Sequence, residues 1–487
     1  MMINDIKRIR SFSKEKQQKF CELLKKEGKK YGVYPITYQQ RRFWRYFELS
    51  PDKGICNGIM ELVFRDRIDE ERILKTVALL LENEEILRTI YLPVDSEVFQ
   101  VIRQETDEKI ERYDLCSNAE NALDEYQKLC FAEYNKPFDI ANEIPFRAFL
   151  ARISEDECRL CITMHHICFD GWALLIMKDD ILGLYCNPDE TIEKLKKRFS
   201  YSDYTLWQMK RIKEKDYLEK LEYLCSNIDG YNTYLYLDGE KKNASEDRFC
   251  GKTLVKMISP DYISEVKALA AELRVSDFSI FLMIYMFVMY LYSGQTSILT
   301  GFPSLNRENE DFSKVMGFCA SVVAVRADID EKATFKELLL KISDTLNAAL
   351  ERQEVVSEHI VEHCKNDICM PDEFFIDKCF SFQDAALFHV DTEQKLQVDG
   401  TEISYNMINF AEQTNMRYRL LMTVVESLNG FVLQMGYAYG VIPDTLAESF
   451  IQTVLDLFYY IFSNDKSNIN RQVSEFAEEF RNEKKLD

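Results

Sequence analysis

Two adjacent histidines are the residues of this sequence whose types and spacing most clearly allow chemistry. His165 and His166 stand in the run HHICFDG, which ends in Asp170 and Gly171. Only five histidines occur among 487 residues, so an adjacent pair just before an Asp-Gly turn is not expected by chance. A neutral imidazole can accept a proton from an attacking amine or hydroxyl. The run therefore predicts a site for general-base or nucleophile-positioning chemistry.

The local pattern gives the two histidines different roles. The run Arg159–Ile167 alternates like a strand, so consecutive side chains face opposite sides and only one histidine can enter a given cleft. The other must be structural, or must hold the turn. His166 would share its face with an apolar row, made up of Leu160, Ile162 and Met164. Such surroundings lower the pKa of an imidazole and keep it neutral, which favours His166 as the base.

Asp170 and Gly171 complete the pattern at the turn. Asp170 can either orient an imidazole or pair with an arginine, and the sequence alone does not choose between these roles. Gly171 lets the backbone approach a reacting carbonyl closely, which suits an N–H donor to an oxyanion. A helix is expected to follow from Trp172 to about Tyr185.

Composition excludes several classes of function. The net charge is -21, so phosphate backbones are repelled and nucleic acid is not an expected partner. The N-terminus is charged throughout, and the most apolar run, Ile280–Tyr292, is shorter than the roughly 20 residues that a bilayer requires. We therefore expect a cytoplasmic protein with no membrane contact. The cysteine pair Cys158 and Cys161 lacks a second pair at suitable spacing, so no metal site is predicted.

The elements that must position the motif form two successive mixed halves. A charged helical extension is expected at 1–30, and Asp69 is predicted to cap a helix that ends near Asn83. After residue 207 the pattern of helices and strands restarts. The expected helices there are Pro260–Leu273, Asp277–Tyr292 and Pro443–Phe462, and the expected strands are Ser297–Phe302, Ser321–Arg326, Lys378–Phe382 and Gly430–Tyr437. This alternation predicts an α/β protein with two lobes.

The histidine run resembles the HHxxxDG motif of the chloramphenicol-acetyltransferase-like superfamily, and of nonribosomal peptide condensation domains in particular. Other segments resemble further motifs of that family in the same order, over roughly residues 30–465. They are YPITYQQRRFW at 34–44, ENEEILRTIY at 82–91, KPFDIANEIPFRAFL at 136–150, YSDYTLW at 201–207, SGQTSILTGFPSLNR at 293–307, MGFCASVVAVR at 316–326 and CFSFQD at 379–384. Taken together these collinear segments indicate the family.

The resemblance implies a fold and a set of roles. It implies two chloramphenicol-acetyltransferase-like lobes in a V-shaped pseudo-dimer, with the active-site tunnel between them. The expected parts are an N-terminal lobe at 31–205, a C-terminal lobe at 206–465 and a charged tail at 466–487. His166 would be the catalytic histidine, in a motif completed by His165, Asp170 and Gly171. Asp170 would be mainly structural and would pair with an arginine of the other lobe, for which Arg307 is the candidate. Trp172 is assigned to structural support.

The resemblance also implies the reaction. An amine would attack an acyl or aminoacyl thioester carried on the phosphopantetheine arm of a carrier protein, and an amide would form. No permanently bound cofactor and no metal are implied. The chain shows no carrier or adenylation motif, so we expect a free-standing enzyme that meets an acyl or peptidyl carrier protein in trans. The basic cluster at 194–198 is the candidate docking patch, although a solvated helix face also explains it.

Some departures and alternatives stay open. Ser321 stands where the family often has asparagine, and ERQEVVSEH at 351–359 only loosely resembles the family's HQDxPFE segment, so the substrate class is not fixed. The opening motif resembles condensation domains that accept L-configured donors. One alternative is a coenzyme-A-dependent O- or N-acyltransferase, although the DFGWG sequence of plant-type members is absent. Another is a non-catalytic recruitment module, which would not need His166, Asp170 and Gly171.

Overall fold

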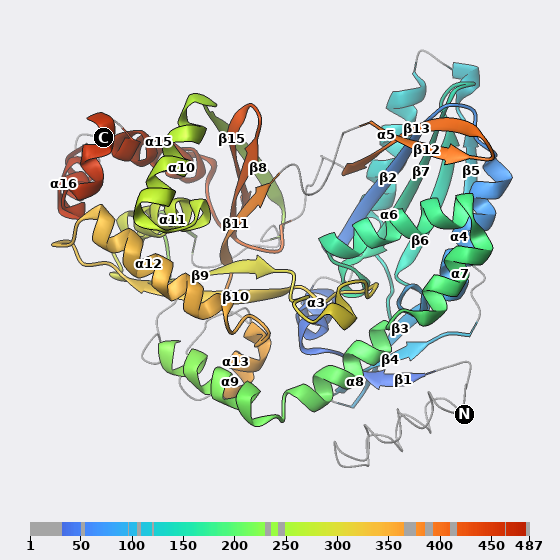
Figure 1. Cartoon of the computed structure of the whole chain (residues 1–487), viewed down its shortest axis with the longest axis horizontal. Helices are drawn as coiled ribbons and strands as arrows, with labels where there is room; N and C mark the ends of the chain where they lie inside the picture. The colour runs from blue at the N-terminus through green and yellow to red at the C-terminus, as the bar shows by residue number, and fades with distance from the viewer. Residues whose placement is uncertain are drawn as a thin grey trace. The chain divides into compact units, whose positions relative to one another are not determined.

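The chain folds into two compact units. The computed structural model describes residues 32–49, 54–95, 97–104, 109–118, 121–228, 235–241, 249–364, 376–384, 393–409, 416–462 and 464–483. Within these ranges, the first unit combines residues up to Leu218 with Leu305–Ala320 and with 393–409, and the second unit takes the remainder (Figure 1). The helical extension predicted at 1–30 lies outside the described residues.

The first unit is built on a six-stranded sheet in the order β12-β13-β2-β7-β6-β5. Its strands are β2 (Asn57–Arg65), β5 (Glu111–Asp114), β6 (Phe146–Arg152), β7 (Glu157–His165), β12 (Gln394–Val398) and β13 (Thr401–Asn409). Neighbours are antiparallel except β5 and β6. Helix α5 (Ala122–Asn135) packs on the face that carries Ile59, Phe149 and Cys161. Strand β7, which leads into the histidine motif, is therefore an inner and well-anchored strand.

Three helices of the first unit pack together beside this sheet, namely α4 (Glu70–Asn83), α6 (Gly171–Cys186) and α7 (Pro188–Lys197) (Figure 1). Helix α4 begins as the sequence predicts, because the Asp69 side chain accepts a hydrogen bond from the Arg72 N–H at 3.1 Å. A smaller sheet, in the order β1-β4-β3, lies in the same unit. Its strands are β1 (Val33–Pro35), β3 (Thr89–Val94) and β4 (Glu97–Ile102), and the nearby helices are α3 (Tyr38–Leu49) and α8 (Tyr201–Arg211).

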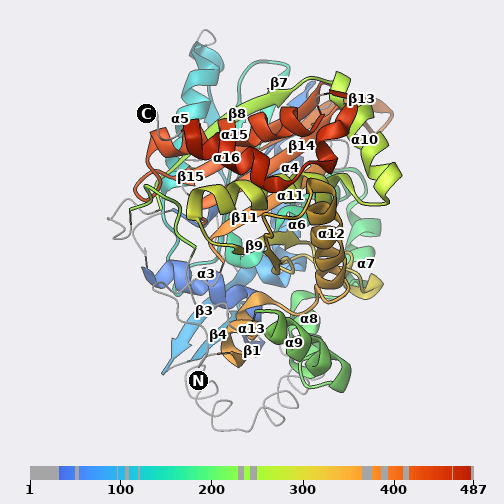
Figure 2. The same ribbon diagram turned by 90° about the vertical axis from the view of Figure 1, so that its left-hand side faces the viewer.

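The second unit has its own six-stranded sheet, in the order β10-β9-β11-β14-β15-β8. Its strands are β8 (Gly251–Ile258), β9 (Ser297–Ser304), β10 (Ser321–Asp328), β11 (Lys378–Asp384), β14 (Leu420–Ser427) and β15 (Gly430–Ala438). Its main helices are α10 (Asp261–Leu273), α11 (Asp277–Ser293), α12 (Phe335–Leu350), α15 (Asp444–Phe462) and α16 (Val473–Glu483), which lie in front of the sheet in Figure 2. They and the sheet share one apolar core, so α11 is almost wholly buried.

In the described part of the chain, no single helix is both long enough and apolar enough to cross a membrane. Only α10 and α11 together, bent by 97°, would reach the required length and composition.

The units differ from the simple division that the sequence suggests. Residue 206, the predicted boundary, lies inside α8. Strand β13 returns to the first unit, where Asn406 pairs with Val63. The predicted charged tail contains helix α16, which buries Val473, Phe476 and Ala477 in the core of the second unit. Its apolar residues recur at helical spacing and so form one buried face, while its charged residues cover the other.

The basic cluster at 194–198 contains one residue that the docking prediction misassigns. Arg198 is half-buried, and its side chain, 12% exposed, reaches Glu84 after α4 and Asp180 of α6. Its guanidinium donates to both carboxylate oxygens of Asp180, at 3.0 and 2.7 Å, and to Glu84. Lys194 and Lys196 are exposed and pair with glutamates of their own helix. A glutamate at position 198 would bring a third buried carboxylate beside Asp180 and Glu84, so such a variant would disturb the fold and could not report on docking.

This buried cluster predicts a pH-dependent stability. Burial raises the pKa of Glu84 to about 7, since the desolvation outweighs the attraction of Arg198, and Asp180 adds to the rise. Between about pH 4.5 and pH 7 the folded chain therefore holds a proton that the unfolded chain has lost, so this contribution to stability falls as pH rises. Glu84→Gln mimics the protonated form. As the pH rises from 5 to 7.5, wild type should lose stability that Glu84→Gln keeps. The difference in free energy of unfolding between the variant and wild type should therefore increase by up to about 3 kcal/mol.

Urea denaturation of both proteins across this pH range measures the difference. Glu82→Gln, on the exposed face of the same helix, is the matched control and should run parallel to wild type. A Glu84→Gln curve that also runs parallel to wild type would contradict the assignment.

Candidate active site

Strand β7 ends at His165, two residues before the end of the strand predicted from the sequence. The His165 N–H donates to the Pro145 carbonyl at 3.1 Å and the His166 N–H donates to the Cys56 carbonyl at 2.7 Å. The chain then turns into a short 3₁₀ helix, His166–Cys168. The strand predicted at Arg159–Ile167 is therefore too long at its C-terminal end. His166 does not continue the alternation of the strand, and it does not share a strand face with the apolar row.

His165 holds this turn. Its side chain is buried, and its Nδ1 accepts a hydrogen bond from the Ile167 N–H at 3.2 Å. Its ring meets Phe138 edge to face, with centroids 6.4 Å apart. This is one of the two roles that the sequence left open for the histidine that does not enter the cleft.

His166 is half-buried and stacks with two aromatic rings. The Phe43 ring lies 5.4 Å away with an interplanar angle of 13°, and the Phe169 ring lies 4.2 Å away with an angle of 22°. The predicted apolar row of Leu160, Ile162 and Met164 is buried in the sheet behind it. The apolar contacts that the imidazole makes here come from aromatic rings outside the strand, and not from the predicted row.

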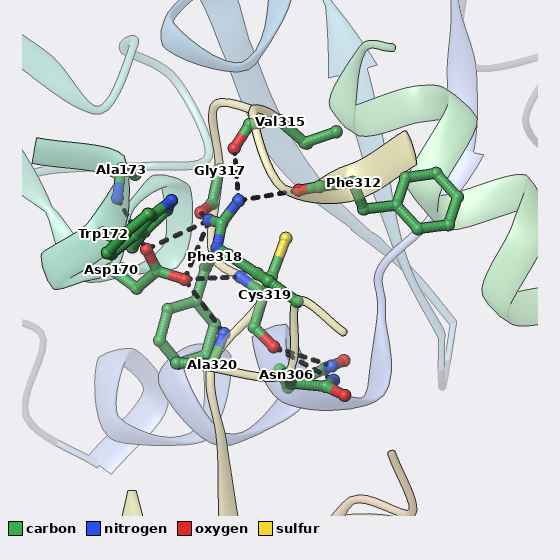
Figure 3. A network of polar contacts seen from close by, with 12 residues as sticks. Asp170, Trp172, Ala173, Asn306, Phe312, Val315, Gly317, Phe318, Cys319 and Ala320 are labelled. Atoms are coloured by element: carbon green, nitrogen blue, oxygen red, sulfur yellow. Dashed lines mark hydrogen bonds and ion pairs between the residues drawn. The ribbon is translucent and has the colours of Figure 1, made fainter. Parts of the chain in front are cut away.

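Asp170 lies at the centre of a dense network of hydrogen bonds (Figure 3). It is the N-cap of α6, and its Oδ1 accepts from the Ala173 N–H at 2.8 Å. Its Oδ2 accepts from the backbone N–H groups of Cys319 and Ala320, at 2.9 and 3.0 Å. The carboxylate is 3% exposed. These bonds occupy it fully as an acceptor, which suits a structural anchor.

The structure brings Arg307 onto this carboxylate. Its guanidinium lies 3.1 Å from both Asp170 oxygens and is itself only 4% exposed. It also donates to the carbonyls of Phe312, Val315 and Gly317, at 3.1, 2.7 and 3.0 Å. Burial is the largest single influence and lowers the pKa of Arg307, but the charge and hydrogen bonds of Asp170, together with Cys319 and Tyr204, raise that pKa overall. The segment Leu305–Ala320 belongs to the same unit as Asp170, whereas the resemblance implied an arginine of the other lobe.

Gly171 and Trp172 open helix α6. Gly171 is exposed, and a Cβ added there would meet no atom within 4 Å. Trp172 donates its indole N–H to the Ser313 carbonyl at 2.9 Å. Trp172 therefore contacts the same segment that Asp170 and Arg307 hold. Among the residues that the structure describes, none places an atom within 4 Å of a Cβ at position 171.

Sequence reasoning assigned no role to several side chains of the opening motif and of YSDYTLW. Gln40 donates to the Ile167 carbonyl at 3.1 Å and Gln39 donates to the Cys319 carbonyl at 3.3 Å. Tyr201 donates its hydroxyl to the Phe318 carbonyl at 2.7 Å. Gly317 has φ +149°, and a Cβ there would lie 2.1 Å from the Tyr201 ring. The sequence does carry a signal for these residues, since they are uncharged polar residues on helical faces that are otherwise apolar. Such a face is expected to be buried, and a buried amide or hydroxyl needs a hydrogen-bond partner.

Comparison with known proteins agrees with this architecture. A family model described as "Condensation domain" matches residues 30–480. Surfactin synthase subunit 1 of Bacillus subtilis (strain 168) is 24% identical over 437 residues, which cover 90% of this chain and 12% of that protein. Bacitracin synthase 1 of Bacillus licheniformis is 23% identical over 471 residues, which cover 94% of this chain and 8% of that protein. The chain thus spans about a tenth of the length of these relatives.

Solved structures show the same fold. The condensation domain from the Monacolin K polyketide synthase MokA has a TM-score of 0.71 at 15% identity, over 90% of this chain and 99% of that one. The four-domain nonribosomal peptide synthetase AB3403 has a TM-score of 0.74 at 15% identity, over 91% of this chain and 34% of that one. The mixed α/β units described above are therefore the two chloramphenicol-acetyltransferase-like lobes of that fold. The chain belongs to the condensation-domain family of nonribosomal peptide synthesis, a family of acyl-transferring enzymes that form amide bonds.

Proposed function

We propose that this chain joins an acyl or aminoacyl thioester to an amine, with His166 as the group that meets the amine. The amine nitrogen attacks the thioester carbonyl, a C–N bond forms, the C–S bond breaks, and the thiol leaves. His166 accepts or orients the proton that the amine must lose. The observation that carries this proposal is the half-buried imidazole of His166, stacked with two aromatic rings just after β7.

The surroundings of Asp170 support His166 as the reacting group. A carboxylate that accepts three backbone hydrogen bonds and an arginine ion pair has no acceptor position left for substrate. Asp170 therefore acts through the structure, by fixing the start of α6 and the segment 305–320. Because Asp170 is engaged in this way, the His166 imidazole is the group of the motif that we assign to the chemistry.

The first turn of α6 suits the developing oxyanion. The N–H groups at a helix N-terminus point outward and attract negative charge. Gly171 is the first residue of this helix, and the space beside it is open. We place the thioester carbonyl there, with its oxygen toward the Gly171 N–H.

Gly171→Ala is expected to lower kcat/KM for amide formation by about 10–10²-fold, because its methyl group would occupy the space of the thioester. The melting temperature should not fall, since no protein atom lies within 4 Å of the added Cβ and alanine favours a helix. Steady-state kinetics together with thermal unfolding measure both effects. Wild-type kinetics in a stable variant would mean that the carbonyl binds elsewhere.

The donor is the part of the proposal that needs a partner. Condensation domains act on substrates that carrier proteins hold on a phosphopantetheine arm. We propose a carrier protein supplied in trans as the donor partner, and a free or carrier-bound amine as the acceptor, with no permanently bound cofactor. The acyl group and the amine are left to experiment.

A donor and acceptor panel tests this function. The same acyl groups should be offered on a carrier protein, on coenzyme A and as N-acetylcysteamine thioesters, each with a set of amines and alcohols, and products identified by mass spectrometry. Amides formed fastest from the carrier-bound donor are expected. A preference for acyl-coenzyme A with alcohols would identify an O-acyltransferase instead. No product from any pair would favour a non-catalytic recruitment module.

A further inference from the structure

The plane of the His166 imidazole is set by rings from two separate elements. Phe43 comes from α3, and Phe169 lies between the 3₁₀ turn and α6. Both rings are close to parallel with the imidazole, at 13° and 22°. Two nearly parallel aromatic rings therefore stack with the imidazole, and we call this arrangement the aromatic slot.

Phe43 is itself held firmly. It is 6% exposed, and the Phe318 ring meets it edge-on with centroids 4.6 Å apart at 78°. Helix α3 is tied to the turn that carries His166, because Gln40 donates to the Ile167 carbonyl at 3.1 Å. Phe318 is fixed in turn through its carbonyl, which accepts the Tyr201 hydroxyl. These contacts therefore hold the Phe43 ring at a fixed distance from the turn that carries His166.

Phe169 is the second ring of the slot. It is 2% exposed, and its ring lies over Gly58 of β2. A Cβ at position 58 would come within 2.5 Å of the Phe169 Cζ, so only glycine leaves room for the ring in this place. Any larger residue at 58 would push the Phe169 ring out of its position beside His166.

We propose that Phe43 is a positioning residue for the reaction: its ring holds the plane of the His166 imidazole and so directs the reacting nitrogen toward the amine. This inference rests on the proposed function. The χ2 torsion of a histidine is broad, so a ring in an open site samples many orientations. Stacking with two nearly parallel rings restricts that freedom. A reacting group misplaced by about 1 Å costs on the order of 10²-fold in rate.

Phe43→Leu separates this role from ordinary packing. Leucine fills much of the same volume but has no flat face to stack on the imidazole. Phe99→Leu is the matched control, because Phe99 is a buried ring of β4 in the same unit and is 1% exposed. The two variants should lose similar stability, and only Phe43→Leu should affect His166.

Two readouts test the proposal. With an N-acetylcysteamine thioester and amine that wild type converts, Phe43→Leu should lower kcat by about 10–10²-fold with little change in KM, and Phe99→Leu should keep both. The second readout is NMR of protein labelled with ¹³C at histidine Cε1. Five histidines give five signals, and His166→Gln assigns one of them. Stacking predicts an upfield ring-proton shift for His166 that Phe43→Leu reduces and Phe99→Leu leaves alone.

The outcomes separate this inference from the proposed function. Wild-type kcat in Phe43→Leu, or a loss no larger than in Phe99→Leu, would overturn the positioning role while amide formation stands. If wild type forms no amide with any pair, the proposed function fails and the His166 signal decides: a signal unmoved by Phe43→Leu overturns the stacking role as well, and a signal that moves supports it.

Discussion

Replacing His166 with alanine should lower the rate of amide formation by about 10²–10⁴-fold, the usual contribution of a general base or proton acceptor. The neighbouring imidazole of His165 cannot take its place, since it is buried and bonded to the turn. The fold should survive, because His166 is half-buried and its backbone N–H bond to Cys56 does not depend on the side chain. Product formation measured by mass spectrometry, with circular dichroism on the same sample, tests both statements.

The control for this experiment is an exposed histidine. His363 lies on the second unit with its side chain 46% exposed, and His363→Ala should keep wild-type turnover. A folded His166→Ala variant that retained near wild-type turnover would remove His166 from the mechanism.

Breaking the Asp170–Arg307 pair should be the most destabilising change in the motif. Removing one partner strands a buried charge and costs roughly 3–5 kcal/mol of unfolding free energy. Asp170→Asn and Arg307→Met should each lower the urea midpoint by this mechanism. The double variant should lose less than the sum, because it leaves neither charge uncompensated. Activity should fall in parallel, since both residues hold the segment 305–320 against the start of α6.

An exposed ion pair of the same unit provides a control double-mutant cycle. Arg112 and Glu71 are 2.6 Å apart, with side chains 40% and 80% exposed. Their coupling energy, measured with Glu71→Gln and Arg112→Met, should be about 0–1 kcal/mol. Strictly additive losses in the Asp170–Arg307 cycle would refute the coupling that the geometry implies.

Local patterns predicted most of the regular elements well. The cap at Asp69, helix α11 and helix α15 follow directly from residue types and helical spacing, and each lies within one or two residues of the expected bounds. The histidine motif stood out by residue type and spacing, whereas the pairing of Asp170 with Arg307 came from the resemblance, and the structure brings these two side chains together. Short-range signals of this kind depend on few residues, so a single sequence carries them.

Features that depend on contacts between distant segments could not be predicted from the sequence. The end of β7 is fixed by hydrogen bonds to Pro145 and Cys56, and nothing in the alternation of RLCITMHHI marks the break. Strand β13 joins the first sheet through β2, more than 300 residues earlier in the chain. The aromatic slot around His166 likewise needs Phe43 from α3. Such contacts depend on which distant segments meet, and no local propensity encodes that.

The buried ion cluster shows a different kind of failure. Arg198 looked like part of a solvated basic face, because it follows three lysines in the sequence. Helix α7 ends at Lys197, so Arg198 leaves the helical face and turns inward to Asp180 and Glu84. The charge pattern predicted a solvent-exposed side chain at this helix end, whereas the structure places the side chain against two buried carboxylates.

Product stoichiometry tests the central claim most directly. Wild type and His166→Ala should be incubated with the best donor thioester and amine of the panel, and amide, free thiol and free acid quantified together by mass spectrometry. The account predicts amide and thiol in equal amounts for wild type, little free acid, and loss of both products in the variant. Thiol released with free acid in place of amide, or equal amide from both proteins, would contradict it.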